Sequence, residues 1–117
     1  MDKVNIQEKF KLFHDYWSPK ILGVLNENYV KIFKAKGEFA WHKHEREDAL
    51  FLVIKGQLKI KLKYREVILN EGEFYIVPQG IEHVAYAEEE AHVLLFEPKQ
   101  EIPTGDTPSE KRVEEWV

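Results

Sequence analysis

The sequence contains no cysteine. This absence excludes disulfide bonds, a thiolate metal site and a cysteine nucleophile. Any metal would have to be bound by histidine, carboxylate or carbonyl groups, which are the harder ligands.

Long apolar runs and an excess of basic charge are also missing. The longest uninterrupted apolar run covers only residues 49–54, too short to cross a bilayer. The first residues contain no apolar stretch typical of a signal peptide, so we expect a cytoplasmic protein with no membrane partner. The 17 basic and 21 acidic residues are well mixed and give a net charge of −4. No nucleic-acid partner is therefore expected.

The length of 117 residues fits one domain, residues 1–117, with a barrel core at about 20–98 and an extended tail at 99–117. Asn5 and Glu8 have the spacing of a helix-capping box. Apolar residues follow at helical spacing up to Pro19, which predicts one short N-terminal helix. The members of this apolar stripe are Ile6, Phe10, Phe13 and Trp17.

From Lys20 onward the apolar pattern changes to a period of two, which is typical of strands. Many short strands separated by close turns indicate an antiparallel sandwich or barrel. The predicted strands are 20–25, 29–35, 49–55, 57–63, 65–69, 73–77, 83–87 and 91–97.

The strand at residues 50–54 is apolar at every position, so both of its faces should be buried. One face would line the interior of a barrel. The other face needs a cover, which is either the N-terminal helix or a second subunit. We therefore predict a homodimer with this strand at the contact.

Histidines are the most informative polar residues. His42 and His44 are two apart, so in an extended strand both imidazoles project from one face. Such a pair is by itself more often a surface feature than a metal site. His83 follows the stiff turn at 78–80, which would orient it reproducibly, although a strand-initial histidine facing water fits equally well. His14 is expected on the surface, and His92 in the core rather than in a pocket.

These residues resemble the two motifs of the small single-domain cupins, the conserved β-barrel family of the cupin 2 type. The first motif runs from Gly37 through the His42-Lys43-His44 pair to Gly56. The second motif has its glycine, proline, glycine and histidine at the family spacing. These residues are Gly72, Pro78, Gly80 and His83.

The resemblance implies an all-β fold, a cupin-type antiparallel β-barrel of the jelly-roll kind with a short N-terminal helix. It implies that His42, His44 and His83 meet inside the barrel as ligands of a divalent metal, usually iron, manganese, nickel or zinc. It also implies a small-molecule ligand. An enzyme of the dioxygenase or isomerase kind, acting on a small polar or anionic molecule, would fit this pattern.

One departure from the family pattern is serious. The glutamate that usually completes the metal site falls at Ala49, and its neighbour Asp48 would point to the opposite face of a regular strand. The late asparagine of the family is replaced by Ala87. Three hypotheses remain open: a metal-binding cupin, a metal-free binding or regulatory cupin, and an auxiliary protein that acts mainly as a dimer.

Overall fold

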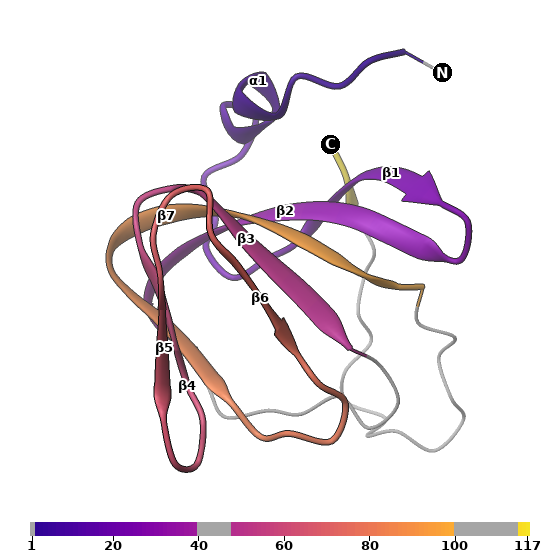
Figure 1. Cartoon of the computed structure of the whole chain (residues 1–117). Helices are drawn as coiled ribbons and strands as arrows, with labels where there is room; N and C mark the ends of the chain where they lie inside the picture. The colour runs from indigo at the N-terminus through magenta and orange to yellow at the C-terminus, as the bar shows by residue number, and fades with distance from the viewer. Residues whose placement is uncertain (1, 40–47, 100–114) are drawn as a thin grey trace.

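The structure is a computed structural model that describes residues 2–39, 48–99 and 115–117. It consists of one short helix and a set of antiparallel strands that curve into a barrel (Figure 1). The elements are α1 (Ile6–Phe10), β1 (Lys20–Leu25), β2 (Asn28–Glu38), β3 (Ala49–Lys55), β4 (Leu58–Lys61), β5 (Glu66–Leu69), β6 (Phe74–Val77), β7 (Val84–Pro98) and β8 (Glu115–Trp116).

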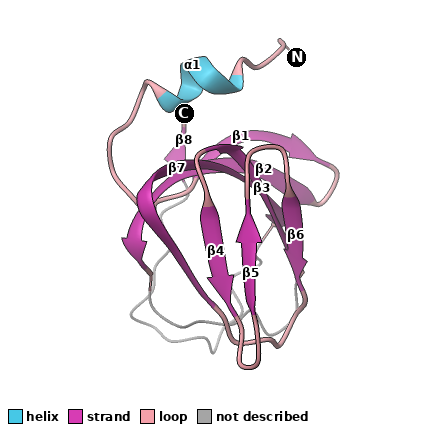
Figure 2. Cartoon of the chain, turned by 60° about the vertical axis from the view of Figure 1, so that its left-hand side comes forward, coloured by secondary structure: helices cyan, strands magenta, loops and turns pink. Residues whose placement is uncertain are grey.

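The long strands β2 and β7 form the spine of the barrel. They pair along their whole length, and the other edge of β7 is shared between β3 on its C-terminal half and β4 on its N-terminal half. β6 pairs with β3, and β5 pairs with β4. Because one bent strand belongs to both parts, the sheet closes around a common interior (Figure 2). The prediction of an antiparallel barrel is thereby confirmed.

The predicted strands agree closely with the structure, with one correction at the end of the barrel. Two separate strands were expected at 83–87 and 91–97, but β7 runs through both without interruption. β2 pairs Ala35 with Ala91 and Gly37 with Ala87, so residues 88–90 bulge out opposite the single residue Lys36. Residues 88–90, which lie between the two predicted strands, therefore form a bulge, which bends a strand without ending it.

The side chains of the sheet separate into an inner and an outer apolar layer. In β3, Ala49, Phe51 and Val53 are buried in the barrel interior, while the alternating positions are only half-buried. The outer layer lies under α1 and centres on Phe10 and Ile32, both almost fully buried. The strand that was expected to be buried on both faces thus has one fully buried face and one partly covered face.

The N-terminal helix begins where the sequence predicts it but is shorter than the apolar stripe. The Asn5 side chain accepts a hydrogen bond from the Glu8 N–H at 3.0 Å, which satisfies one of the free donors of the first turn. The helix ends at Phe10, and Trp17 lies outside it with a φ of +57°. The Trp17 N–H donates to the Lys34 carbonyl instead, so this residue follows β2 rather than a helix axis.

The buried amine of Lys20 on β1 forms ion pairs with both terminal segments of the described chain. Its Nζ lies 2.9 Å from Asp15 Oδ2 and 2.9 Å from Glu115 Oε2. β8 pairs in parallel with β1, and the Val117 carbonyl accepts a hydrogen bond from Lys9 of α1. In the described part of the chain, no helix has the length and apolar character needed to cross a membrane.

A pH effect on stability is expected at this anchor. The hydrogen bond from Lys20 lowers the pKa of Asp15 below its ordinary value. A depressed carboxyl pKa contributes stability above about pH 4, and this stability is lost as the pH falls through the folded value. Because Asp15 is half exposed, Asp15→Asn should cost less than about 1 kcal/mol at pH 7. Urea unfolding of the wild type and Asp15→Asn at pH 7 and pH 3 measures the difference in free energy of unfolding. A difference of the same size at pH 3 would contradict a stabilising role of the Asp15 carboxylate.

Candidate metal centre

His83 is the predicted ligand that the structure describes, and it lies fully buried just before β7. Its Nδ1 is 3.0 Å from the Ile81 carbonyl oxygen. Because a carbonyl can only accept, Nδ1 must donate in this bond, and a neutral ring then carries its lone pair on Nε2. This second atom is also buried. A histidine whose other nitrogen is held by a backbone carbonyl is the usual arrangement of a metal ligand.

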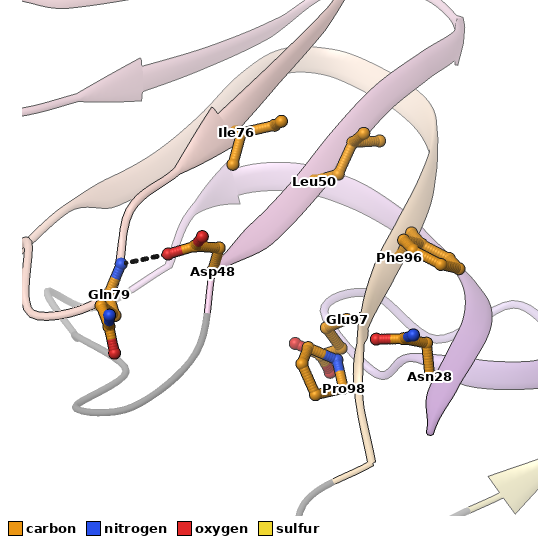
Figure 3. Close-up of a pocket in the computed structure, with 8 residues that line it drawn as sticks. All are labelled: Asn28, Asp48, Leu50, Ile76, Gln79, Phe96, Glu97 and Pro98. Carbon is orange, nitrogen blue, oxygen red and sulfur yellow. Dashed lines mark hydrogen bonds between the residues drawn. The ribbon is translucent and has the colours of Figure 1, made fainter. Parts of the chain in front are cut away.

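The turn before His83 explains why the ring is so well placed. Gly80 adopts a φ of +76°, a conformation that favours glycine, and Pro78 fixes the backbone two residues earlier. Asp48, just before β3, stabilises the same turn. Its Oδ1 accepts a hydrogen bond from the Gln79 N–H at 2.9 Å (Figure 3). The sequence prediction of a stiff turn that orients His83 therefore fits the structure.

Asp48 and Ala49 project to opposite faces of the sheet. Ala49 is buried in the interior, whereas Asp48 borders an outer groove of about 470 Å³. The groove has an apolar floor and polar ends (Figure 3). The Asp48 carboxylate is thus engaged with the turn and does not replace the missing glutamate inside the barrel. The residues around the groove are Asn28, Asp48, Leu50, Ile76, Gln79, Phe96, Glu97 and Pro98.

The interior next to His83 is walled by aromatic rings. Phe51 meets His83 edge to face, with ring centroids 6.3 Å apart, and Phe33 packs on Phe51 in the same manner at 6.2 Å. Trp17 contacts Phe33 at 5.8 Å and stacks on Phe39 at 5.3 Å. Trp17 also donates its indole N–H to the Lys36 carbonyl. Sequence reasoning placed Trp17 on the helix stripe and therefore missed its position against the interior.

An ion pair is buried at one end of the interior, and no sequence motif pointed to it. Lys31 of β2 and Glu97 of β7 are 4% and 3% exposed, and Lys31 Nζ lies 3.0 Å from Glu97 Oε1. Charged groups are almost never buried at this level without a partner. The signal in the sequence was present but weak: both residues fall on the inward positions of strands whose other inward residues are apolar.

The remaining histidines divide into those outside the described residues and those on the outer surface. His42 and His44 lie outside them, so their convergence with His83 remains a prediction. Within residues 2–39, 48–99 and 115–117, no group of three His, Cys, Asp or Glu side chains is arranged to hold a metal ion. His14 is exposed, as expected.

His92 differs from the expectation of a core residue. Its ring stacks on Phe10 of α1 at 4.3 Å, and its Nε2 lies 2.8 Å from Glu90 Oε2. The same glutamate accepts a hydrogen bond from the Tyr16 hydroxyl. His92 thus holds the N-terminal segment against the outer face and does not line the interior.

Fold and residue pattern together define a cupin barrel, and comparison with known proteins agrees. The model of the Cupin_2 family, described as Cupin domain, matches residues 29–97. The matched segment is more than half of the chain, so the protein belongs to the Cupin_2 family.

Individual relatives support the same assignment. A crystal structure of a cupin-2 domain containing protein from Shewanella frigidimarina NCIMB 400 is 38% identical, with a TM-score of 0.81 over 82% of this chain and 94% of that one. The protein NMB1881 from Neisseria meningitidis shares the fold at 21% identity and a TM-score of 0.77, over 84% of this chain and all of that one. The uncharacterized protein YdbB of Bacillus subtilis (strain 168) is 33% identical over 60 residues, which are 50% of this chain. The chain spans about half (53%) of YdbB.

Proposed function

We propose that this cupin binds a divalent metal through His42, His44 and His83 and uses the site to bind a small molecule. The observation that carries the proposal is the geometry of His83. Its ring is buried, its Nδ1 is held by the Ile81 carbonyl, and its Nε2 is buried with it. This donor fits a metal such as iron, manganese, nickel or zinc, all of which accept imidazole ligands.

The surroundings of His83 favour a particular kind of ligand. A bound divalent metal would supply Lewis acidity to a coordinated oxygen. Three neutral imidazoles would leave the charge of the metal uncompensated, which favours an anionic or polar group on the ligand. The rings of Phe51 and Phe33 offer an apolar wall against which the rest of a small molecule can pack. The same wall excludes water, which strengthens electrostatic interactions.

A metal-free binding module is the second candidate, and Ala49 is the observation that favours it. Ala49 is fully buried at the position of the usual glutamate ligand and offers no donor atom. In this alternative the barrel keeps its shape and binds its small molecule through the aromatic wall alone.

We further propose that two chains form a homodimer through the outer face of β6 and β3. Phe74 and Ile76 of β6 are 59% and 46% exposed, and they pair across the sheet with the half-buried Leu52 and Leu50. α1 covers the other end of this face, near Ile54. An apolar patch can be self-complementary, so a second copy related by a two-fold axis would cover the exposed apolar side chains of both chains.

Removal of the His83 imidazole tests the metal site. His83→Ala should lower zinc affinity by a factor of about 100 or more, since loss of supporting groups alone costs 10–100-fold. The measurement is metal content by elemental analysis after dialysis against a chelator, on protein prepared without a histidine tag. His14→Ala is the matched control because His14 is exposed and should change nothing. Equal metal retention by both variants would contradict the proposal.

A further inference from the structure

We infer that residues 14–19 form a strap that closes the barrel interior along one edge of β2, with Trp17 as the closing side chain. Release of this strap opens a route by which a small molecule reaches the aromatic interior. The route rests on the proposed binding of a small molecule there, and it requires no metal. The chain descends from α1 to the sheet in this region, before β1 begins (Figure 2).

One edge of β2 has no strand beside it over its second half. β7 pairs with β2 from Asn28 to Glu38 on one side, whereas β1 pairs with it only as far as Ile32 on the other. Beyond that point no other described strand joins this edge. The strap takes its place, and Tyr16 forms an isolated parallel bridge with Lys34. Because an unpaired edge exposes backbone donors and acceptors, the strap completes the wall of the barrel at this point.

Trp17 covers this edge from the inner side. Its backbone N–H donates to the Lys34 carbonyl at 2.8 Å, and its indole N–H donates to the Lys36 carbonyl at 2.9 Å. The centroid of its ring lies 5.8 Å from that of Phe33 and 5.3 Å from that of Phe39, on which it stacks. The indole therefore covers the inner face of the second half of β2.

Tyr16 holds the strap from the outer side. Its hydroxyl donates to Glu90 Oε1 at 2.8 Å, and His92 Nε2 lies 2.8 Å from Oε2 of the same glutamate. The hydrogen bonds from His92 and Tyr16 lower the pKa of Glu90, so its carboxylate stays charged at neutral pH. Consecutive residues of an extended chain project to opposite faces, so Tyr16 and Trp17 contact β2 from its two sides.

The strap is anchored at both ends but held by few contacts between them. Phe13 and Lys20 are buried, and the Phe13 carbonyl accepts a hydrogen bond from the Lys34 amine at 2.7 Å. Between these anchors, Trp17 has a φ of +57°, a left-handed conformation that is strained for a bulky side chain. The side-chain hydrogen bonds of Tyr16 and Trp17 are both exposed. Such segments open locally at a fraction of the cost of unfolding.

The first experiment measures access to the interior with an introduced thiol. The chain has no cysteine, so Ala35→Cys places a single thiol on β2, between the two carbonyls that Trp17 contacts. Val77→Cys places it elsewhere in the same buried interior, on β6. The labelling rate with a nitrobenzoate disulfide reports how often a small aromatic anion reaches each thiol. Under native conditions Ala35→Cys should react faster than Val77→Cys, because only position 35 lies beside the strap.

Tyr16→Phe should raise the labelling rate of Ala35→Cys by about 3- to 10-fold, because it removes a hydrogen bond to a charged carboxylate and keeps the ring. The rate of Val77→Cys should not change. Tyr64→Phe is the matched control, since Tyr64 is 88% exposed and lies far along the chain from the strap. Trp17→Ala should raise the rate of Ala35→Cys further. Adding Tyr16→Phe to Trp17→Ala should then have little effect, because the closing side chain is already absent.

Hydrogen exchange provides a second measurement that needs no cysteine. The amide and indole N–H groups of Trp17 should exchange faster in Tyr16→Phe than in the wild type. The Val53 amide donates to the Glu73 carbonyl at 3.0 Å, away from the strap, and should exchange at an unchanged rate. If a cysteine variant does not fold, this comparison decides, and equal changes at Trp17 and Val53 would overturn the strap.

The outcomes separate the strap from the proposed function. Unchanged labelling of Ala35→Cys in the presence of Tyr16→Phe would overturn the strap. Equal acceleration of Ala35→Cys and Val77→Cys would also overturn it, because the Tyr16 contact would then stabilise the whole barrel and not a local closure. Neither measurement requires a metal, so a protein that binds no zinc but shows local opening beside Trp17 would keep the strap and lose only the metal site.

Discussion

Ile76→Asp is expected to convert the proposed homodimer into a monomer. Ile76 is 46% exposed on β6 and pairs with Leu50 in the centre of the outer apolar face. A carboxylate there would be buried without a partner in the dimer, at a cost of several kcal/mol. In the monomer the same side chain remains in water, so the barrel itself should lose little stability. Light scattering at micromolar concentration should then give the 13.9 kDa of one chain for the variant and twice that for the wild type.

Ile68→Asp provides the matched control for this experiment. Ile68 is 49% exposed and also lies on a short strand, but β5 pairs with β4 on the other part of the barrel. Its substitution should leave the molecular mass at the dimer value. A wild type that is monomeric at these concentrations would contradict the proposal, as would two variants with identical masses.

Much of the fold could be predicted because the apolar pattern is local. The period of two predicted β1 and β3 with their observed ends, at 20–25 and 49–55. The bulge in β7 could not be predicted, because it arises from pairing with a strand more than 50 positions away in the sequence, at Gly37. Glycine at position 56 illustrates the same limit: a side chain there would come within 3.0 Å of the Glu90 carbonyl, which only the folded structure shows.

The candidate site divides in the same way. The stiff turn before His83 was evident from its residue types. Pro78 restricts the backbone and Gly80 permits a positive φ, and both effects are local to those residues. The partnership of Lys31 with Glu97 depends on the register of β2 against β7, which no local pattern encodes. The helical spacing of the apolar stripe includes Trp17, so the sequence placed it on the helix. In the structure, the Trp17 N–H instead donates to the Lys34 carbonyl of β2. Local patterns thus predicted the turn before His83 and missed the contacts that depend on tertiary pairing.

Ala49→Glu is expected to tighten metal binding and to destabilise the metal-free protein. The new side chain would restore the acidic ligand that the family pattern places at this position. It would face the interior, two residues before Phe51, whose ring contacts His83. It would also stand directly beside Glu97 in the register of β3 and β7. Two like charges in opposed positions repel each other, and burial raises the cost to several kcal/mol without a metal. A bound divalent cation offsets this repulsion, so stability should become strongly dependent on metal.

The experiment compares three proteins: the wild type, Ala49→Glu and Ala49→Gln. Zinc affinity and the zinc-induced rise in melting temperature are measured for each. Ala49→Glu should show the largest rise, since metal binding to the folded state adds directly to its stability. Ala49→Gln, which adds the same volume without charge, controls for overpacking of the interior. If Ala49→Glu and Ala49→Gln bind zinc equally well, position 49 does not face the metal, and the proposed arrangement of the site is wrong.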